Sequence, residues 1–294
     1  EELNVDSLGV ASLGEALHLR KSLPSMSTDI MVLSDTGMVF DHVRELYLDY
    51  NISPVLSSIE DLQDFLQDKR FRNAPVFLKV NTGMNRLGIL PTEVEKACSL
   101  LNAYGRRSIE HLLTHFACSY KRFRKGDKTD KQLTLFQKVK KQFSEEGISI
   151  VKTSCSNSGA IEQGVGLEES HVRPGLMLYG PGIGLEESGW AGRSISSLKT
   201  YVIKSEPIKK GAPIGYGAHV CHEDGNIVFL PIGYGDGMLT YYSKAEIEIE
   251  GEIGKIMGRV NMDMVAIWFP KDAKRSFQRG EIVKIWGHDR FSVT

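Results

Sequence analysis

Two short segments rich in small and hydroxyl residues offer the clearest chemistry in the sequence. Residues 155–159 read Cys-Ser-Asn-Ser-Gly, and residues 173–180 read Arg-Pro-Gly-Leu-Met-Leu-Tyr-Gly. Ser158 supplies a hydroxyl, and Gly175 lets backbone N–H groups come close to an anion. The two segments are therefore a candidate phosphate cradle, although a simple turn is the commoner explanation of an isolated Asn-Ser-Gly.

The chain before these segments alternates short apolar runs with amphipathic helical patterns. The predicted strands are residues 7–12, 30–33, 54–56, 76–80, 109–114, 149–153 and the stretch near Val172, and the predicted helices are residues 15–21, 41–50, 59–70, the segment with Pro91 in its first turn, and 131–143. Such alternation predicts an α/β fold with a parallel sheet. We count seven strands, so we expect the first strand of a (β/α)8 TIM-like barrel before Glu1. On this count the two segments follow strands seven and eight, where barrels often bind phosphate.

The character of the sequence changes in the last third, where helical periodicity is absent and glycines separate apolar runs. The predicted strands are residues 198–208, 227–232, 245–253, 264–269 and 281–286. We therefore predict two domains, a barrel over residues 1–193 and a mostly β domain over residues 194–294. The second domain is expected to be incomplete, because Thr294 lies within an expected strand.

The composition excludes several classes of function. A chain of 294 residues with 41% hydrophobic and 25% charged residues suits two soluble domains with full cores. The net charge of −1 gives no strong attraction to nucleic acid or to an anionic membrane. A β domain that binds nucleic acid is disfavoured further, since no basic stripe with interleaved aromatics is visible. No apolar run is long enough for a membrane span, and no secretory signal is visible.

The four cysteines are Cys98, Cys118, Cys155 and Cys221. They are widely spaced and form no Cys-x-x-Cys pair, which disfavours a zinc site. A disulfide framework is unexpected in a chain of this size, so we predict free, buried or half-buried thiols. Free thiols favour a reducing, cytoplasmic setting.

Seven short blocks run in order along nearly the whole chain: Phe77–Gly88, Thr114–Ala117, Asn157-Ser158, Val172–Gly180, Gly215–Gly217, Pro231–Gly237 and Gly258–Asp263. No single block is specific, but seven at compatible spacing are very specific. Together they resemble the alanine racemase family. The resemblance implies a pyridoxal 5′-phosphate-dependent isomerase that interconverts L-alanine and D-alanine. It also implies a cytoplasmic homodimer with shared active sites that supplies D-alanine for peptidoglycan and the cell wall.

Racemisation removes the α-proton from one face and returns a proton to the other, so it needs acid–base groups on both sides. The resemblance assigns one of these roles to Tyr216, which would reach the active site of the neighbouring subunit. The other belongs to the lysine that forms the Schiff base with the cofactor, expected shortly before Glu1. No Lys-Ala-Asn-Ala-Tyr-Gly type motif occurs in the sequence. We interpret the sequence as a piece of a longer product, inactive by itself, with a natural truncation as the alternative.

The cofactor-binding positions implied by the resemblance are His115, Asn157, Ser158, Arg173, Gly175 and Leu176. His115 would lie against the cofactor ring, and Arg173 would face the pyridine nitrogen. Because arginine keeps its proton, that nitrogen would stay unprotonated. Ser154 stands where many members have a histidine bonded to this arginine, which leaves the orientation of Arg173 open.

The substrate-side positions implied by the resemblance are Arg86, Met262 and Tyr234. Arg86 would lie near the substrate carboxylate, Met262 would offer its backbone N–H to it, and Tyr234 would stand near the entrance. Lys79 matches a lysine that is carbamylated in some members. Taken alone, each of these residues also has a structural explanation, such as a solvated lysine or an aromatic in a turn.

Two alternatives stay open at this point. A serine or broad-specificity racemase on the same scaffold differs only in pocket size, and one methylene or hydroxyl changes discrimination by about 1–3 kcal/mol. A non-catalytic homologue that only binds pyridoxal phosphate would fit the missing lysine. It would not need the substrate-side residues Arg86, Tyr216 and Met262.

Overall fold

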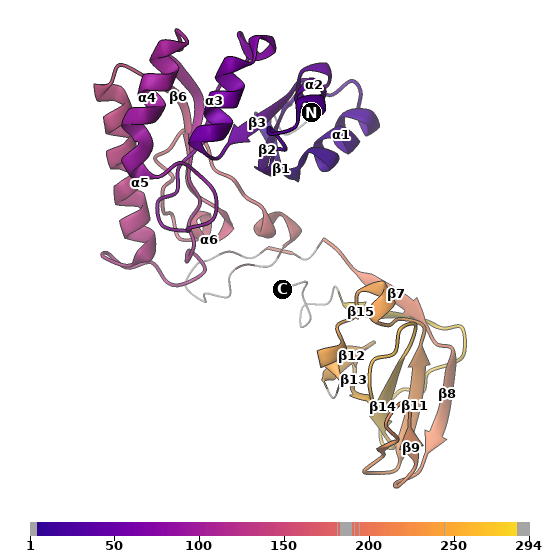
Figure 1. The fold of residues 1–294 in the computed structure, drawn as a ribbon. Helices are drawn as coiled ribbons and strands as arrows, with labels where there is room; N and C mark the ends of the chain where they lie inside the picture. The colour runs from indigo at the N-terminus through magenta and orange to yellow at the C-terminus, as the bar shows by residue number, and fades with distance from the viewer. Residues whose placement is uncertain are drawn as a thin grey trace. The chain divides into compact units, whose positions relative to one another are not determined.

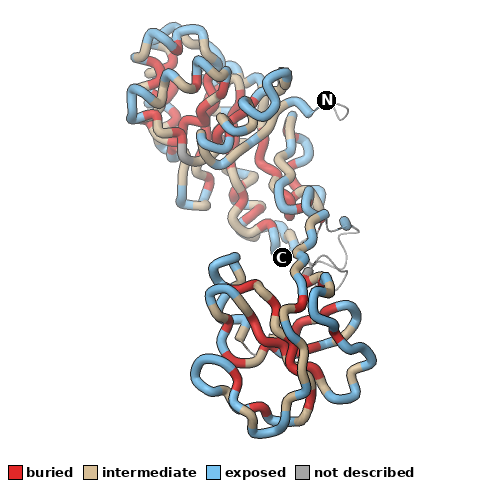
Figure 2. Tube along the Cα trace, turned by 90° about the vertical axis from the view of Figure 1, so that its right-hand side faces the viewer, coloured by how far each residue is buried: buried red, intermediate tan, exposed pale blue. Residues whose placement is uncertain are grey.

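The computed structural model describes residues 5–180, 182, 190, 192–193, 195–243 and 245–286. The chain divides into two compact units, one of residues 1–178 with 182–190 and one of residues 179–181 with 191–294 (Figure 1). Residue 194, at the predicted domain boundary, and the predicted strand end at Thr294 lie outside the described residues. Buried residues gather inside each unit, so each has its own core (Figure 2).

The first unit is built on a sheet of six parallel strands whose spatial order follows the chain. The strands are β1 (Ser7–Ser12), β2 (Asp29–Asp35), β3 (Ile52–Leu56), β4 (Phe77–Lys79), β5 (Ser108–Leu113) and β6 (Ser149–Ser154). Every neighbouring pair is parallel. The predicted alternation of strands and crossover helices in this region is therefore confirmed.

The helices of this unit are α1 (Leu13–Ser22), α2 (Asp41–Asp49), α3 (Ile59–Gln67), α4 (Val94–Ala103), α5 (Lys128–Glu145) and α6 (Ser158–Glu162). Short 3-10 turns cover Lys69–Phe71, Pro91–Glu93 and Leu176–Tyr179. Ser12 and Glu15 form a capping box that starts α1. The prediction of one helix over 59–70 was wrong at its end. Asp68 leaves the helical conformation (ψ 109°), and its carboxylate accepts the backbone N–H of Arg70.

The seventh predicted strand, near Val172, is reduced to a single parallel bridge between Ser154 and His171. Two backbone bonds hold this segment beside β6, from His171 N to Thr153 O (3.0 Å) and from Arg173 N to Ser156 O (2.9 Å). The ladder fails because Thr153 N donates to the Ser170 hydroxyl instead of a carbonyl (2.7 Å). The segment nevertheless brings Arg173 beside the end of β6.

The second unit contains an antiparallel sheet of five strands in the order β12-β13-β14-β11-β8, and two sheets of two strands. Its strands are β7 (Leu198–Tyr201), β8 (Lys204–Ile208), β9 (Pro213–Ile214), β10 (His219–Val220), β11 (Gly225–Leu230), β12 (Glu246–Ile249), β13 (Glu252–Met257), β14 (Val265–Pro270) and β15 (Ile282–Trp286). 3-10 turns cover Tyr234–Asp236 and Thr240–Tyr242. The prediction of a mostly β region is confirmed for the described residues.

Two strand predictions in this unit were wrong. Residues 198–208 form two strands of different sheets, because Val202 N donates to Glu281 O whereas Ile203 N donates to Phe229 O. Residues 245–253 cover all of β12 and the start of β13, which are joined by Glu250 (φ 51°) and Gly251 (φ 88°). Two consecutive left-handed residues are typical of a tight hairpin, so the chain reverses there.

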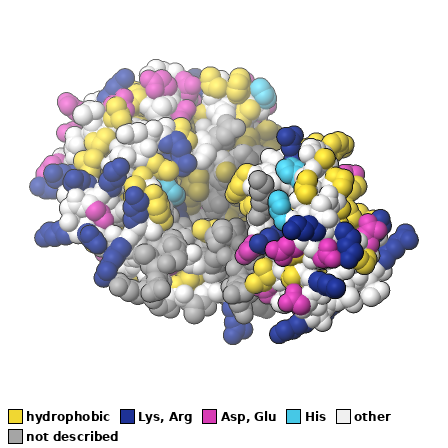
Figure 3. Space-filling view, turned by 90° about the horizontal axis from the view of Figure 1, so that it is seen from below, with side chains coloured by type: hydrophobic (Ala, Val, Ile, Leu, Met, Phe, Trp, Pro, Cys, Tyr) yellow, Lys and Arg dark blue, Asp and Glu magenta, His cyan; other side chains and the backbone are white. Residues whose placement is uncertain are grey.

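Three further features bear on the sequence predictions. All four cysteines are free, with Cys118 half-buried and the other three buried, as predicted. None of the helices in the described ranges is long and apolar enough to cross a bilayer. Figure 3 shows Lys and Arg side chains together with Asp and Glu side chains on the face in view.

Candidate functional site

A cavity of about 990 Å³ in the first unit is lined by residues of β1, β2 and β5 and of the segments after β5 and β6. All of the predicted cofactor-binding residues line it, namely His115, Asn157, Ser158, Arg173, Gly175 and Leu176. These positions come from three chain segments that are far apart in sequence. Parallel pairing of β5 with β6, and of His171 with Ser154, brings the segments together.

Arg173 is held by three polar groups around its guanidinium. Its Nε donates to Ser154 Oγ (2.9 Å), its Nη2 donates to Thr114 O, and its Nη1 lies 3.4 Å from His115 Nδ1. Burial lowers the pKa of Arg173 to about 10, which leaves it a cation at neutral pH. The orientation left open by the sequence is therefore set, with the Ser154 hydroxyl as a direct hydrogen-bond partner.

His115 lies between Arg173 and Asn157. Its Nε2 is 3.4 Å from Asn157 Nδ2, and this amide nitrogen donates to Phe116 O (3.2 Å). Burial, followed by the nearby positive charge of Arg173, lowers the pKa of His115 to about 4. The imidazole is therefore neutral at pH 7.

The Ser158 hydroxyl faces the backbone that follows Pro174. Its Oγ accepts the N–H groups of Gly175 and Met177, both at 3.1 Å. A Cβ built on Gly175 would meet no heavy atom within 4 Å, so the space beside this glycine is open. Because its oxygen accepts these two bonds, the Ser158 hydroxyl keeps its proton to donate, and a hydroxyl at the edge of a cavity is a donor suited to phosphate. The residues present fit the phosphate of the pyridoxal phosphate that the resemblance implies.

Lys79 and Arg86 are not among the residues that line this cavity. Lys79 ends β4, is 5% exposed and donates from Nζ to Leu33 O (3.3 Å). Burial, followed by the charges of Arg86 and Arg173, lowers the pKa of Lys79 to about 8. Arg86 is exposed on the loop after β4. Gly88 (φ 122°) closes that loop, and a Cβ there would lie 2.6 Å from Asn81 N.

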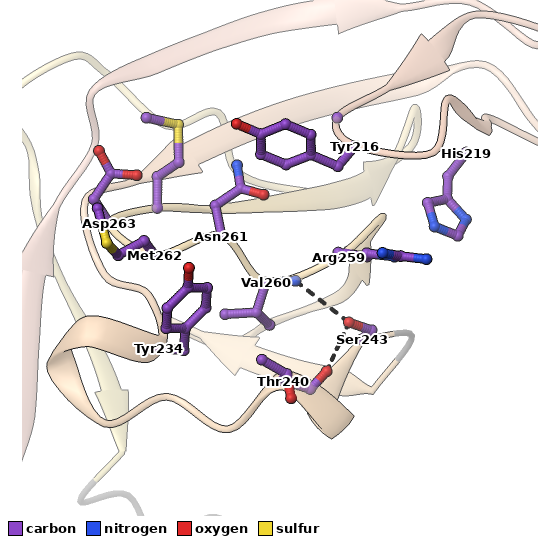
Figure 4. Close-up of a pocket in the computed structure, with 12 residues that line it drawn as sticks. Tyr216, His219, Tyr234, Thr240, Ser243, Arg259, Val260, Asn261, Met262 and Asp263 are labelled. Atoms are coloured by element: carbon purple, nitrogen blue, oxygen red, sulfur yellow. Dashed lines mark hydrogen bonds between the residues drawn. The ribbon is translucent and has the colours of Figure 1, made fainter.

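The second unit has its own pocket of about 1360 Å³, lined by Tyr216, Tyr234 and Met262 among others (Figure 4). Tyr234 N donates to Asn261 O (2.9 Å), and Gly235 N donates to Met262 O (2.8 Å). The close approach of these two backbone segments requires glycine at 233, because a Cβ there would lie 2.2 Å from Asn261 O. The Gly-Tyr-Gly segment is thereby pinned to the loop that carries Met262.

Tyr216 occupies the turn between β9 and β10, flanked by Gly215 (φ 57°) and Gly217 (φ 82°), which adopt left-handed conformations. Tyr216, Tyr234 and Met262 are 72%, 52% and 61% exposed. Figure 4 shows both tyrosine rings beside Asn261. Within the described residues the Met262 N–H has no hydrogen-bond acceptor, so it is available to a ligand.

The structure adds one polar residue that sequence reasoning missed. His111 on β5 lines the cavity, is 1% exposed, and places its Nε2 2.8 Å from Ser154 Oγ. The available signal was the serine at 154 itself. The resemblance implies a histidine bonded to the arginine at this position. A serine there indicates that an imidazole on the neighbouring strand could take the same place.

Comparison with known proteins places this geometry in a family. The family model described as "Alanine racemase, N-terminal domain" matches residues 1–182, and the model for the C-terminal domain matches residues 195–294. An alanine racemase of Treponema denticola is 31% identical over 273 residues, which cover 90% of this chain and 69% of that protein. An alanine racemase of Rickettsia akari is 29% identical over 267 residues, covering 88% and 69% of the two chains.

The solved structures agree with the sequence relatives. Alanine racemase of Clostridium difficile 630 superimposes with a TM-score of 0.84 at 26% identity, covering 99% of this chain and 75% of that chain. Alanine racemase of Bartonella henselae, described with covalently bound pyridoxal phosphate, gives 0.82 at 25% identity, covering 98% and 77%. The predicted fold class, a TIM-like barrel followed by a mostly β domain, is confirmed. The chain belongs to the alanine racemase family of isomerases.

Proposed function

We propose that the full-length protein is a pyridoxal phosphate-dependent racemase that interconverts L-alanine and D-alanine. The observation that carries the proposal is the single cavity lined by all of the predicted cofactor-binding residues. We further propose a cytoplasmic homodimer that supplies D-alanine for peptidoglycan, with a barrel domain over residues 1–193 and a β domain over residues 194–294.

The residues of the first cavity would hold the cofactor at its two ends. Ser158, Gly175 and Leu176 would bind the phosphate, and His115 and Asn157 would pack near the ring. When bound, pyridoxal phosphate supplies an electron sink that makes the α-proton of an amino acid easier to remove. Arg173 would face the ring nitrogen as a fixed cation. It keeps its proton at neutral pH and would leave the ring nitrogen unprotonated, so the sink is weakened and side reactions such as transamination are disfavoured.

Tyr216 would exchange the α-proton on one face of the substrate. A phenol ordinarily titrates near 10, so it needs cationic or hydrogen-bonding neighbours to act as a base. Its high exposure within its own unit supports a role at a surface that another subunit covers. This is why we propose a homodimer in which each β domain completes the barrel cavity of the partner.

The remaining residues would orient the substrate. The N–H of Met262, which has no acceptor among the residues that the structure describes, and the guanidinium of Arg86 would bind its carboxylate. Tyr234 would restrict entry to the pocket. Carbamylation of Lys79 would convert a cation into an anion able to hold Arg86. The lowered pKa of Lys79 supports this, because only the neutral amine reacts with carbon dioxide.

The test uses the product of the full-length gene, loaded with pyridoxal phosphate and incubated with L-alanine or L-serine. We expect loss of optical activity with alanine, and preference for serine would identify a serine racemase instead. Cofactor binding without any racemisation would identify a non-catalytic homologue. Normal turnover by the Tyr216→Phe variant would remove that residue from the mechanism.

A further inference from the structure

A buried chain of three side chains runs from the interior of β5 to the cavity. His111 Nε2 lies 2.8 Å from Ser154 Oγ, and the same oxygen accepts a hydrogen bond from Arg173 Nε at 2.9 Å. His111 and Ser154 are 1% and 0% exposed, so solvent does not compete for these bonds. The pairing of β5 with β6 fixes the two strands in register.

The direction of each hydrogen bond follows from the chemistry of the groups. A guanidinium only donates, so Ser154 Oγ must be the acceptor of the bond from Arg173. The proton of the Ser154 hydroxyl is then free to be donated, and His111 Nε2 can accept it within the described residues. This arrangement requires the tautomer of His111 that carries its proton on Nδ1.

The surroundings of His111 keep it in this neutral form. Its ring lies 5.5 Å from the ring of His171 and 6.1 Å from that of Phe77. Burial, followed by the positive charges of Arg173, His171 and Lys152, lowers the pKa of His111 to about 3. An imidazolium at this place would face several cations and could not accept a hydrogen bond.

We propose that His111 is a positioning residue for Arg173, acting through the Ser154 hydroxyl that lies between them. An acceptor behind the serine turns the Oγ lone pairs towards Arg173 and holds the guanidinium in the cavity. This inference rests on the proposed function, because it assigns Arg173 to the cofactor ring.

The test compares full-length His111→Phe, Ser154→Ala and the double variant with the parent protein. Each single change should weaken pyridoxal phosphate binding about tenfold, the effect of one lost hydrogen bond, and the double change should do no more. His111→Gln, whose side-chain oxygen can accept, should restore most of the affinity. Ser156→Ala removes a buried hydroxyl that donates to Val165 O and lies 3.7 Å from Cys155 Sγ, and it should leave the affinity unchanged.

Single effects that multiply in the double variant, or parent-like affinity in His111→Phe, would overturn the proposal. ¹⁵N NMR of the parent gives a second readout that needs neither cofactor nor variants. Unprotonated Nε2 and protonated Nδ1 at His111 are expected, and a proton on Nε2 would be contradictory. A parent protein that binds cofactor but does not racemise alanine would refute the proposed activity while leaving the His111 result intact.

Discussion

The two pockets of this molecule are built in opposite ways. In the first unit Arg173, His115 and Ser158 make hydrogen bonds to neighbouring protein groups, and burial shifts the pKa values of Arg173 and His115. In the second unit Tyr216, Tyr234 and Met262 are more than half exposed. The side chains of the first pocket are held in place by hydrogen bonds within their own unit, whereas the side chains of the second pocket are exposed to solvent.

This difference indicates a division of labour. A cofactor that stays bound needs a site that is organised beforehand, because orienting donors after binding would weaken affinity. A catalytic group offered to another subunit must instead be exposed until the subunits associate. Changes in the first pocket should therefore affect cofactor binding, and changes in the second should affect substrate binding or turnover without changing the affinity for the cofactor.

The largest expected effect is that of Tyr216→Phe, which removes only a phenolic oxygen. We expect kcat to fall by about 10²–10⁴-fold, the range for loss of a general acid or base, with unchanged affinity for pyridoxal phosphate. Steady-state kinetics and cofactor titration measure the two quantities. Tyr241→Phe is the matched control, since Tyr241 is 74% exposed and does not line the pocket.

Ser158→Ala should show the opposite behaviour. Loss of a hydrogen bond to a charged group is worth about 1.5–3 kcal/mol, so the affinity for pyridoxal phosphate should fall roughly 10- to 100-fold. At saturating cofactor, kcat should recover to near the parent value. A fall in kcat that saturating cofactor does not reverse would break the division between the two pockets.

The pH dependence of stability should separate the units in the same way. The pKa values of His111 and His115 are lowered to about 3 and 4, so the unfolded state binds more protons below pH 6.5. Above pH 6.5 the two neutral histidines therefore do not reduce the free energy of unfolding of the first unit. That free energy decreases as the pH falls towards 4, by up to about 1.4 kcal/mol per pH unit for each histidine.

Denaturant unfolding followed by helical circular dichroism reports on the first unit, because all the described α-helices belong to it. His111→Phe should roughly halve the slope of stability against pH in this range. A slope that does not change would show that His111 is not the group that takes up the proton.

The smallest expected effect concerns Lys79. With a pKa of about 8, about half of its amines are neutral at pH 8, so carbamylation should rise as the pH rises through this value. A ¹³C carbamate signal from labelled bicarbonate measures it, and Lys152, which is paired with Glu110, offers a comparison lysine. No carbamate signal at pH 8 would refute the modification.

The fold was predictable where the physical cause is local. Alternation of apolar runs with helical periodicity predicted the parallel sheet, and the small residues at 158 and 175 indicated two segments that line one cavity. The hairpin within residues 245–253 was missed because the alternating Glu and Ile residues continue through Glu250 and Gly251, whose left-handed backbone reverses the chain. His111 was missed because its partner lies on another strand, 43 residues away.

Mixing two inactive variants tests the central claim most directly, that Tyr216 of one subunit serves the cofactor cavity of its partner. Full-length Tyr216→Phe is combined with a variant defective in the barrel, Arg173→Ala, under conditions that exchange subunits and at a pyridoxal phosphate concentration that loads the parent barrel but not the Arg173→Ala barrel. Random mixing makes half of the dimers hybrid, each with one intact site of two, so about a quarter of parent racemase activity should return. If the mixture stays as inactive as its components, each active site is formed within a single chain and the account is wrong.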